Sequence, residues 1–128
     1  MKPNQYIAVV SACVAAYLTG SVALAAQPCD QLKIDEVRAS AATAADVLIN
    51  CDLTLEPHFV ITKRLILEGP PATGVTVDCK NAKLDGGKGA PNFKRDMIQV
   101  RSSKNASTGA WERPEDVVVR NCRIVGSA

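Results

Sequence analysis

The chain has 128 residues, of which 15 are basic and 13 acidic, and its formal net charge at pH 7 is +2. This balance excludes a protein that binds nucleic acid or another polyanion through bulk charge. Aromatic residues make up only 4% of the sequence, so the core of a folded domain must be aliphatic.

The N-terminal residues have the order of a cleavable secretory signal peptide. Lys2 precedes an apolar run over residues 6–18, small and polar residues follow, and Ala25 ends a small-residue motif. This order predicts a signal peptide over residues 1–25, cleaved after Ala25. A transmembrane span needs about 20 apolar residues in succession, and this run is shorter. We therefore expect a secreted or periplasmic protein that keeps no membrane segment after cleavage.

A short alternating pattern recurs along the rest of the chain. Apolar residues alternate with others and lead into a glycine over residues 65–69, 82–86 and 122–126. Companion triplets with the same alternation occupy residues 53–55, 75–77, 98–100 and 117–119. Alternation with period 2 indicates strands, and a regular spacing of about twenty residues is typical of repeat proteins.

Short strands at this spacing predict an all-β fold, a parallel β-helix of about three to four coils. Inward side chains of successive coils would then stack in two apolar columns. One column contains Leu67, Leu84 and Ile124, and the other contains Leu55, Val77, Val100 and Val119. A small β-sandwich in which the spacing is accidental is the alternative.

Residues 117–126, and residues 75–86 before them, resemble the repeat of right-handed parallel β-helix proteins of the pectate-lyase-like superfamily. The resemblance extends over residues 50–128, and it carries packing positions rather than chemistry. It implies a carbohydrate-active protein, such as a polysaccharide lyase or a glycoside hydrolase, and it implies Ca²⁺ as the one candidate cofactor. The residues themselves indicate no cofactor.

The two ends of the predicted coils differ. Residues 26–50 form a candidate N-terminal cap segment, in which residues 30–45 favour a short helix, and residues 51–128 form the coils. The last coil has no such cover, and solenoids need capped ends. We therefore expect that the chain is truncated at its C-terminus or that another subunit supplies the cap. An uncapped coil also predicts self-association through its edge.

Four cysteines remain after the loss of Cys13 with the signal peptide, and an oxidising compartment allows them to pair. Counting coils places Cys79 and Cys122 two rungs apart, so we expect both to be buried and unpaired. A disulfide between Cys29 and Cys51 would pin the cap segment to the first coil. A metal site is not expected, because there is no CxxC pair and His58 is the only histidine.

Two irregular loops, residues 86–96 and 101–114, interrupt the repeat, and binding residues are often found on such loops. Trp111 is flanked by Glu112 and Arg113, a combination that can stack on a sugar ring and hydrogen-bond its hydroxyls. The alternative, which we favour at this stage, is that Trp111 folds its own loop down against the coil. The candidate ligand-binding residues are Trp111, Arg101, Arg113, Asp85 and Asp96.

No catalytic residue can be assigned from the sequence. Glycoside hydrolysis needs two carboxyls about 5–9.5 Å apart over one groove, and only Asp85 and Asp96 are candidates to approach one another, at a loop mouth. The sequence therefore predicts a secreted protein that binds or acts on polysaccharide, with no nucleic-acid partner and no catalytic site in the visible chain. The alternatives are a structural or adhesive surface solenoid without enzymatic activity and an inactive fragment of a longer protein.

Overall fold

The computed structural model describes residues 26–42, 44–87 and 96–125. The predicted signal peptide, most of the first irregular loop and Gly126 lie outside the described residues. Within the described residues, no helix is long and apolar enough to cross a membrane.

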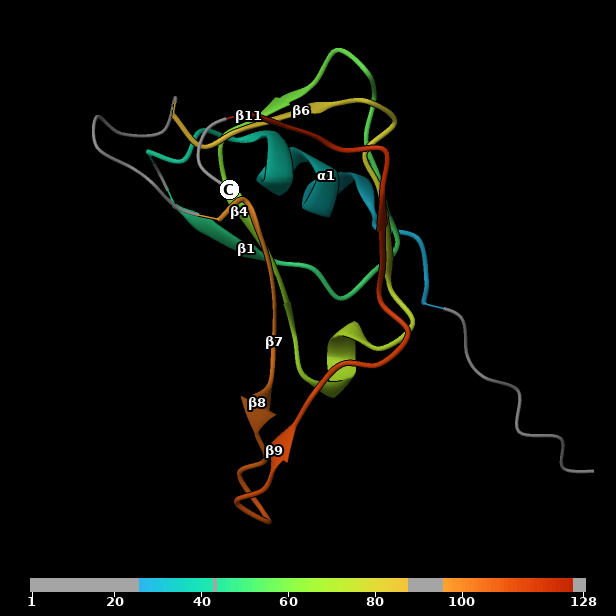
Figure 1. Cartoon of the computed structure of the whole chain (residues 1–128), viewed down its shortest axis with the longest axis vertical. Coiled ribbons are helices and arrows are strands. Elements are labelled where there is room, and N and C mark those ends of the chain that lie inside the picture. Colours follow the sequence, from blue (N-terminus) through green and yellow to red (C-terminus); the bar gives the residue numbers. More distant parts are fainter. Residues whose placement is uncertain (1–25, 43, 88–95, 126–128) are drawn as a thin grey trace, which may run out of the picture.

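The described strands form three parallel sheets of three strands each and one antiparallel pair (Figure 1). The first sheet consists of β1 (Asp46–Leu48), β4 (Arg64–Glu68) and β7 (Ile98–Arg101). The second consists of β2 (Leu53–Thr54), β5 (Thr76–Asp78) and β10 (Val118–Arg120). The third consists of β3 (Val60–Ile61), β6 (Lys83–Asp85) and β11 (Arg123–Val125). The antiparallel pair is β8 (Ser103–Lys104) and β9 (Trp111–Glu112), and a 3-10 turn, η1 (Pro70–Ala72), follows β4.

The all-β class is confirmed, but the predicted parallel β-helix is not. The strands gather in three separate short sheets that do not close into a solenoid. The predicted columns are also partly wrong. Leu84 does lie opposite Ile124, and Val77 opposite Val119, but Leu67 lies opposite Val100 in a different sheet. The reason is that alternation reports which residues share a face, whereas pairing between distant strands depends on the path of the chain.

A short N-terminal helix, α1 (Gln31–Arg38), is present within the segment predicted to be helical. It begins where the Asp30 carboxylate accepts a hydrogen bond from the Lys33 backbone N–H at 2.8 Å, an N-cap that satisfies one free amide of the first turn. Its last residue is Arg38, so the helix is shorter than the predicted segment, and Ala39 follows in an extended conformation. Val37 is the helix residue that is fully buried, and α1 contacts β3.

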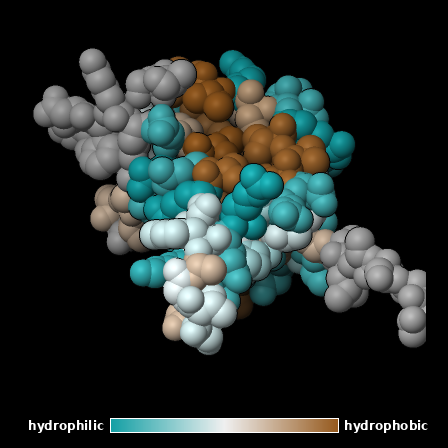
Figure 2. Space-filling view, turned by 60° about the horizontal axis from the view of Figure 1, so that its bottom comes forward, coloured by the Kyte–Doolittle hydropathy of each residue, from teal (hydrophilic) through white to brown (hydrophobic). Residues whose placement is uncertain are grey.

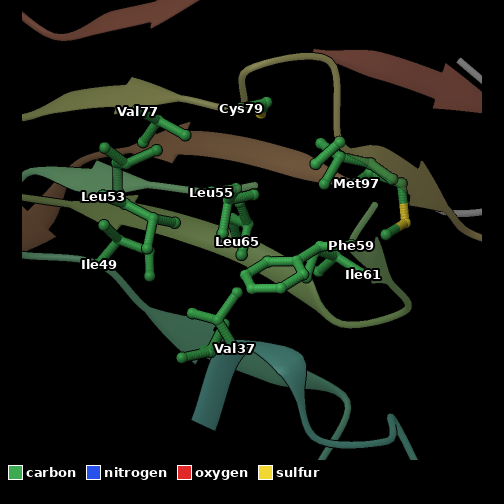
Figure 3. Close-up of a cluster of buried hydrophobic side chains, with 14 of the residues drawn as sticks. Val37, Ile49, Leu53, Leu55, Phe59, Ile61, Leu65, Val77, Cys79 and Met97 are labelled. Atoms are coloured by element: carbon green, nitrogen blue, oxygen red, sulfur yellow. The ribbon is translucent and has the colours of Figure 1, made fainter. Parts of the chain in front are cut away.

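The core is aliphatic, as the composition requires. It is built from side chains of the first two strands of each sheet and of the segments that flank these strands, together with Val37 of α1. In Figure 3, Val37 of α1 lies beneath Phe59 and Leu65, so the helix covers one end of this core. β1, β2, β3 and β5 alternate between buried and more exposed positions, as strands with one face on a core do, whereas β4 has three successive buried residues.

Two disulfides staple the described chain. Cys29–Cys51 is present, with its Cα atoms 4.9 Å apart, which confirms the predicted bridge between the cap segment and the strands. Cys79–Cys122 is also present, with Cα atoms 4.8 Å apart, so the prediction that these two cysteines are unpaired is wrong. That prediction placed residues 98–100 between them. The strand β7 instead joins the first sheet, and β10 pairs directly with β5.

Candidate functional site

The strands β8 and β9 form a hairpin that projects from the sheets (Figure 1). Asn105 builds its turn: the side-chain oxygen accepts hydrogen bonds from the backbone N–H groups of Ser107 (2.8 Å) and Thr108 (3.2 Å). Its backbone N–H donates to the Ala110 carbonyl at 2.8 Å, and its carbonyl accepts from Gly109, which has a positive φ of 72°. An Asx turn of this kind holds a short loop in a single conformation.

Trp111 lies on this hairpin with 71% of its surface exposed. The expectation that it folds down against the strands is therefore wrong. The antiparallel register places Lys104 directly opposite Trp111, so both side chains lie on the same face of the hairpin. This face combines a large aromatic surface with a cation, and nothing in the described chain covers it.

The predicted neighbours of Trp111 divide between the two faces. Glu112 is paired in register with Ser103, and because side chains alternate along a strand it belongs to the face opposite Trp111. There its carboxylate accepts a hydrogen bond from the Asn105 amide at 3.0 Å, which ties β9 to the turn. Arg113 follows β9 and is exposed. The segment predicted to be an irregular loop is therefore a hairpin, and sequence adjacency grouped Glu112 with the wrong face of it.

Arg101 lies at the base of the hairpin, where β7 ends. Its guanidinium donates to Glu68 at 2.8 Å and to the Gln99 side chain at 3.3 Å, while its carbonyl accepts from the Gly69 N–H at 2.9 Å. Gly69 has a φ of +63°, and a Cβ there would collide with the side chain of Ser103, so only glycine allows the hairpin to leave the sheet at this point. Arg101 therefore positions the hairpin through an ion pair.

The two candidate carboxylates occupy different environments. Asp85 is buried in β6, where its carboxylate lies 2.9 Å from the Lys83 ammonium and accepts from the Gly87 N–H at 3.1 Å. Asp96 is exposed immediately before β7, in the first sheet. Because protein groups engage Asp85, its carboxylate is not presented to a ligand.

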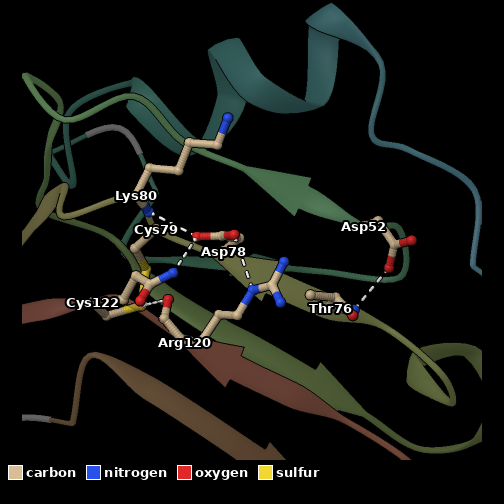
Figure 4. A network of polar contacts seen from close by, with 8 residues as sticks. Asp52, Thr76, Asp78, Cys79, Lys80, Arg120 and Cys122 are labelled. Carbon is tan, nitrogen blue, oxygen red and sulfur yellow. Dashed lines mark hydrogen bonds and ion pairs between the residues drawn. A yellow bond between two sulfur atoms is a disulfide. The ribbon is translucent and has the colours of Figure 1, made fainter.

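A second polar cluster surrounds Asp78 at the end of β5, beside the Cys79–Cys122 disulfide (Figure 4). The Asp78 carboxylate accepts from the Asn121 amide (3.1 Å), the Lys80 backbone N–H (3.0 Å) and the Arg120 guanidinium (2.9 Å). The Asn121 and Lys80 hydrogen bonds, helped by Arg120 and opposed by burial, lower the pKa of Asp78 from its ordinary value. Arg120 is the last residue of β10 and Asn121 follows it, so the cluster joins β5 to β10.

The lowered pKa of Asp78 predicts a stability that depends on pH. The contribution of a carboxyl with a depressed folded-state pKa is fully present above its unfolded pKa, about pH 4, and is lost as the pH falls through the folded value. Urea denaturation measures the free energy of unfolding at pH 7 and at pH 3, and we expect the difference between the two values to be smaller in Asp78→Asn than in the wild type. Asp96→Asn, at an exposed carboxyl, is the matched control and should show the same difference as the wild type. Equal acid sensitivity of wild type and Asp78→Asn would contradict the assignment.

A shallow pocket of about 250 Å³ lies beside α1 and is lined by Arg38, His58, Phe59 and Val60. The Arg38 guanidinium lies 4.2 Å from the centre of the Phe59 ring, and His58 meets the same ring edge-on. These contacts pack the helix end against the strands. No group of three or more His, Cys, Asp or Glu side chains in the described residues could hold a metal ion.

Comparison with known proteins finds no matching family model, no similar curated protein and no similar solved structure. The resemblance to the pectate-lyase-like superfamily is therefore corrected on two grounds. No family match supports it, and the strands form separate three-stranded sheets rather than a solenoid. The repeat that suggested it is an alternation of apolar and other residues along single strands, and such alternation does not specify which strands pair.

Proposed function

We propose that this chain is an exported, disulfide-stapled protein that binds polysaccharide on the Trp111 face of the β8–β9 hairpin, without a catalytic step. The exposure of Trp111 beside Lys104 is the observation that carries the proposal. The flat apolar face of an indole packs on the C–H face of a sugar ring, and a neighbouring ammonium donates to hydroxyl or carboxylate oxygens of the sugar.

The construction of the hairpin supports this proposal. Its turn is held by Asn105, its far face by the Asn105–Glu112 hydrogen bond, and its base by the Arg101–Glu68 ion pair. A rigid platform reduces the entropy lost on binding, because the aromatic side chain is already displayed. Export is supported by the two disulfides, which persist in oxidising compartments, and by the predicted signal peptide.

Trp111 is the only tryptophan in the sequence, so intrinsic fluorescence reports on this face alone. We expect soluble neutral and acidic polysaccharides, titrated in turn, to include at least one that shifts the emission. Affinity electrophoresis with that polysaccharide gives a dissociation constant from the retardation of the protein. Trp111→Ala should raise this constant at least about tenfold, as truncation of a central aromatic anchor does. Leu32→Ala, at an exposed apolar residue of α1, is the matched control and should bind like the wild type.

Two results would overturn the proposal. One is the absence of an emission shift with every polysaccharide in the panel. The other is undiminished retardation of Trp111→Ala, which would place any binding elsewhere on the molecule.

The alternative of a structural or adhesive surface module is favoured by a different observation. Aliphatic side chains are exposed along β7, β10 and β11, none of which pairs with β8 or β9. The two activities would use different residues, so one protein can have both.

A further inference from the structure

Lys104 is the first of two cations beside Trp111 on the β8–β9 hairpin. The Asn105 backbone N–H donates to the Ala110 carbonyl at 2.8 Å, so these two residues form a hydrogen-bonded pair. Pairs alternate along an antiparallel ladder, and Lys104 and Trp111 therefore form the non-hydrogen-bonded pair that follows. The side chains of such a pair are the closest in a ladder, with Cβ atoms about 4.5–5.5 Å apart. The Lys104 side chain thus leaves β8 directly beside the indole.

Arg113 is the second cation on this face. It follows β9 directly, is exposed, and precedes Pro114. The residue before a proline adopts extended conformations, because the proline ring clashes with it in the helical region. In an extended segment, side chains two positions apart point to the same side, about 6–7 Å from one another along the chain. The Arg113 side chain therefore lies on the side of the hairpin that displays Trp111.

Within the described chain, the charges of Lys104 and Arg113 are not offset by a carboxylate. Glu112 is the one acid in residues 101–114. It belongs to the far face of the hairpin, where its carboxylate accepts from the Asn105 amide at 3.0 Å. Lys104 and Arg113 form no ion pair with any residue that the structure describes. Both cations are thus available to a ligand.

The other charged groups near the hairpin are held in place by the sheets and their turns. The Arg101 guanidinium at the base donates to Glu68 at 2.8 Å. Beyond Pro114, the Glu115 backbone N–H donates to the Thr73 hydroxyl at 3.2 Å, and its carbonyl accepts from the Gly74 N–H at 2.9 Å. The chain has therefore left the hairpin by Glu115, and the unpaired positive charge of the hairpin lies beside Trp111.

The hairpin stands apart from the apolar surface of the molecule. In Figure 2 it comes forward as a mostly pale projection, and the brown patch of hydrophobic residues lies above it. The centre of an interface with a folded protein is apolar over a wider area than one indole. The formal net charge of the chain is only +2, so attraction at this face depends on the two local cations and not on bulk charge.

The two cations distinguish charged sugars from neutral ones. Hydrogen bonds from a guanidinium or an ammonium to an anionic oxygen are about twice as strong as those between neutral groups. The guanidinium of Arg113 presents a planar fork that matches the oxygens of a carboxylate or a sulfate, and the Lys104 ammonium acts as a compact point charge. A neutral sugar offers hydroxyl groups only, so it uses neither property fully.

We infer that the Trp111 face selects anionic polysaccharides, in which a sugar ring lies on the indole and carboxylate or sulfate groups face Lys104 and Arg113. This inference rests on the proposed function and names the substrate class of the same site. Carboxylate and sulfate share the chemistry that the two cations recognise.

Two sets of soluble polymers test the inference on the oxidised mature protein, with the emission of Trp111 as the readout. One set is dextran, carboxymethyl-dextran and dextran sulfate; the other is hydroxyethyl-cellulose, carboxymethyl-cellulose and cellulose sulfate. A charged polymer should bind at least about tenfold more tightly than the neutral polymer of its set. The carboxymethyl and sulfate polymers show which anion is preferred. Polyglutamate, which has carboxylates without sugar rings, should bind at least about tenfold more weakly than the preferred polymer.

Substitutions at the two cations test which residues give the preference. Lys104→Gln and Arg113→Gln should each lower the ratio of charged to neutral affinity by about three- to tenfold, and the double variant should bring it close to one. Lys104→Arg keeps the charge and should keep the preference. Lys80→Gln, at an exposed lysine outside the hairpin, is the matched control and should leave the ratio unchanged. Thermal unfolding of each variant confirms that it is folded.

Three results would overturn the inference. The first is a neutral polymer that binds as tightly as its charged forms, which would leave the proposed function intact. The second is an unchanged ratio in the double variant, which would place the recognition of charge elsewhere. The third is equal binding of polyglutamate, which would show that charge alone is recognised. If no charged dextran or cellulose shifts the emission, the inference also fails, and the wider panel of polysaccharides decides separately on the proposed function.

Discussion

Replacing Cys79 and Cys122 by alanine should lower the free energy of unfolding by about 4 kcal/mol, because the bridge closes a loop across a sequence separation of 43 residues. The loss comes mainly from the unfolded chain, which regains the freedom to separate the ends of β5 and β10. Urea denaturation of the oxidised wild type and of the double variant measures the difference. We also expect faster amide hydrogen exchange along β10 and β11, because the bridge fixes Cys122, which lies between these two strands, to Cys79.

The second disulfide provides the matched control. Cys29 and Cys51 are separated by 22 residues, so the corresponding double alanine variant should lose about 3 kcal/mol by the same chain-entropy argument. Its hydrogen exchange should increase around the cap segment and leave β10 and β11 protected. If breaking Cys79–Cys122 costs less than about 1 kcal/mol, the bridge does not restrict the unfolded chain as argued.

Leu84→Ala should destabilise the protein by about 2–5 kcal/mol, the range for a leucine deleted from a packed interior. Leu84 is fully buried in β6, and its directly opposed neighbour in β11 is Ile124, which is half exposed. We expect Ile124→Ala to cost less, about 1 kcal/mol, since about half of its side-chain surface is already in water. Urea denaturation of the two variants compares the free energy lost at two positions that lie directly opposite one another on neighbouring strands and differ in burial.

Equal losses in the two variants would contradict the arrangement, because they would mean that Ile124 is buried in solution. Repeating the measurement over a range of protein concentrations shows how that burial arises. Stability that rises with concentration would indicate that a second copy covers β11.

The positions of the strands were predictable from local pattern. The triplets at residues 53–55, 75–77, 98–100 and 117–119 overlap β2, β5, β7 and β10, because alternation of period 2 is a property of each segment by itself. The assembly of the strands was not predictable in this way. The sequence order placed β7 between β5 and β10, whereas β7 pairs with β4 and leaves β5 adjacent to β10. That one misplacement caused the error about Cys79 and Cys122.

The sequence alone drew attention to Trp111, and the register of β8 with β9 showed which residues share its face. A lone tryptophan drew attention to this segment, which was expected to be an irregular loop. The hairpin itself, the exposure of Trp111 and its pairing with Lys104 depend on how β8 meets β9. Lys104 and the turn-forming role of Asn105 were missed. The short Asn-to-Gly segment before Trp111 is the signal for a turn that was available in the sequence.

The sequence by itself determined the features that depend on neighbours along the chain. These are the all-β class, the short helix before the strands, the aliphatic core and the even number of cysteines after the predicted cleavage. Only the tertiary structure decided which strands pair, which cysteines join, which face Trp111 occupies and which end of the core stays open. Those properties arise from contacts between residues far apart in sequence, and alternation along one strand does not specify its partner.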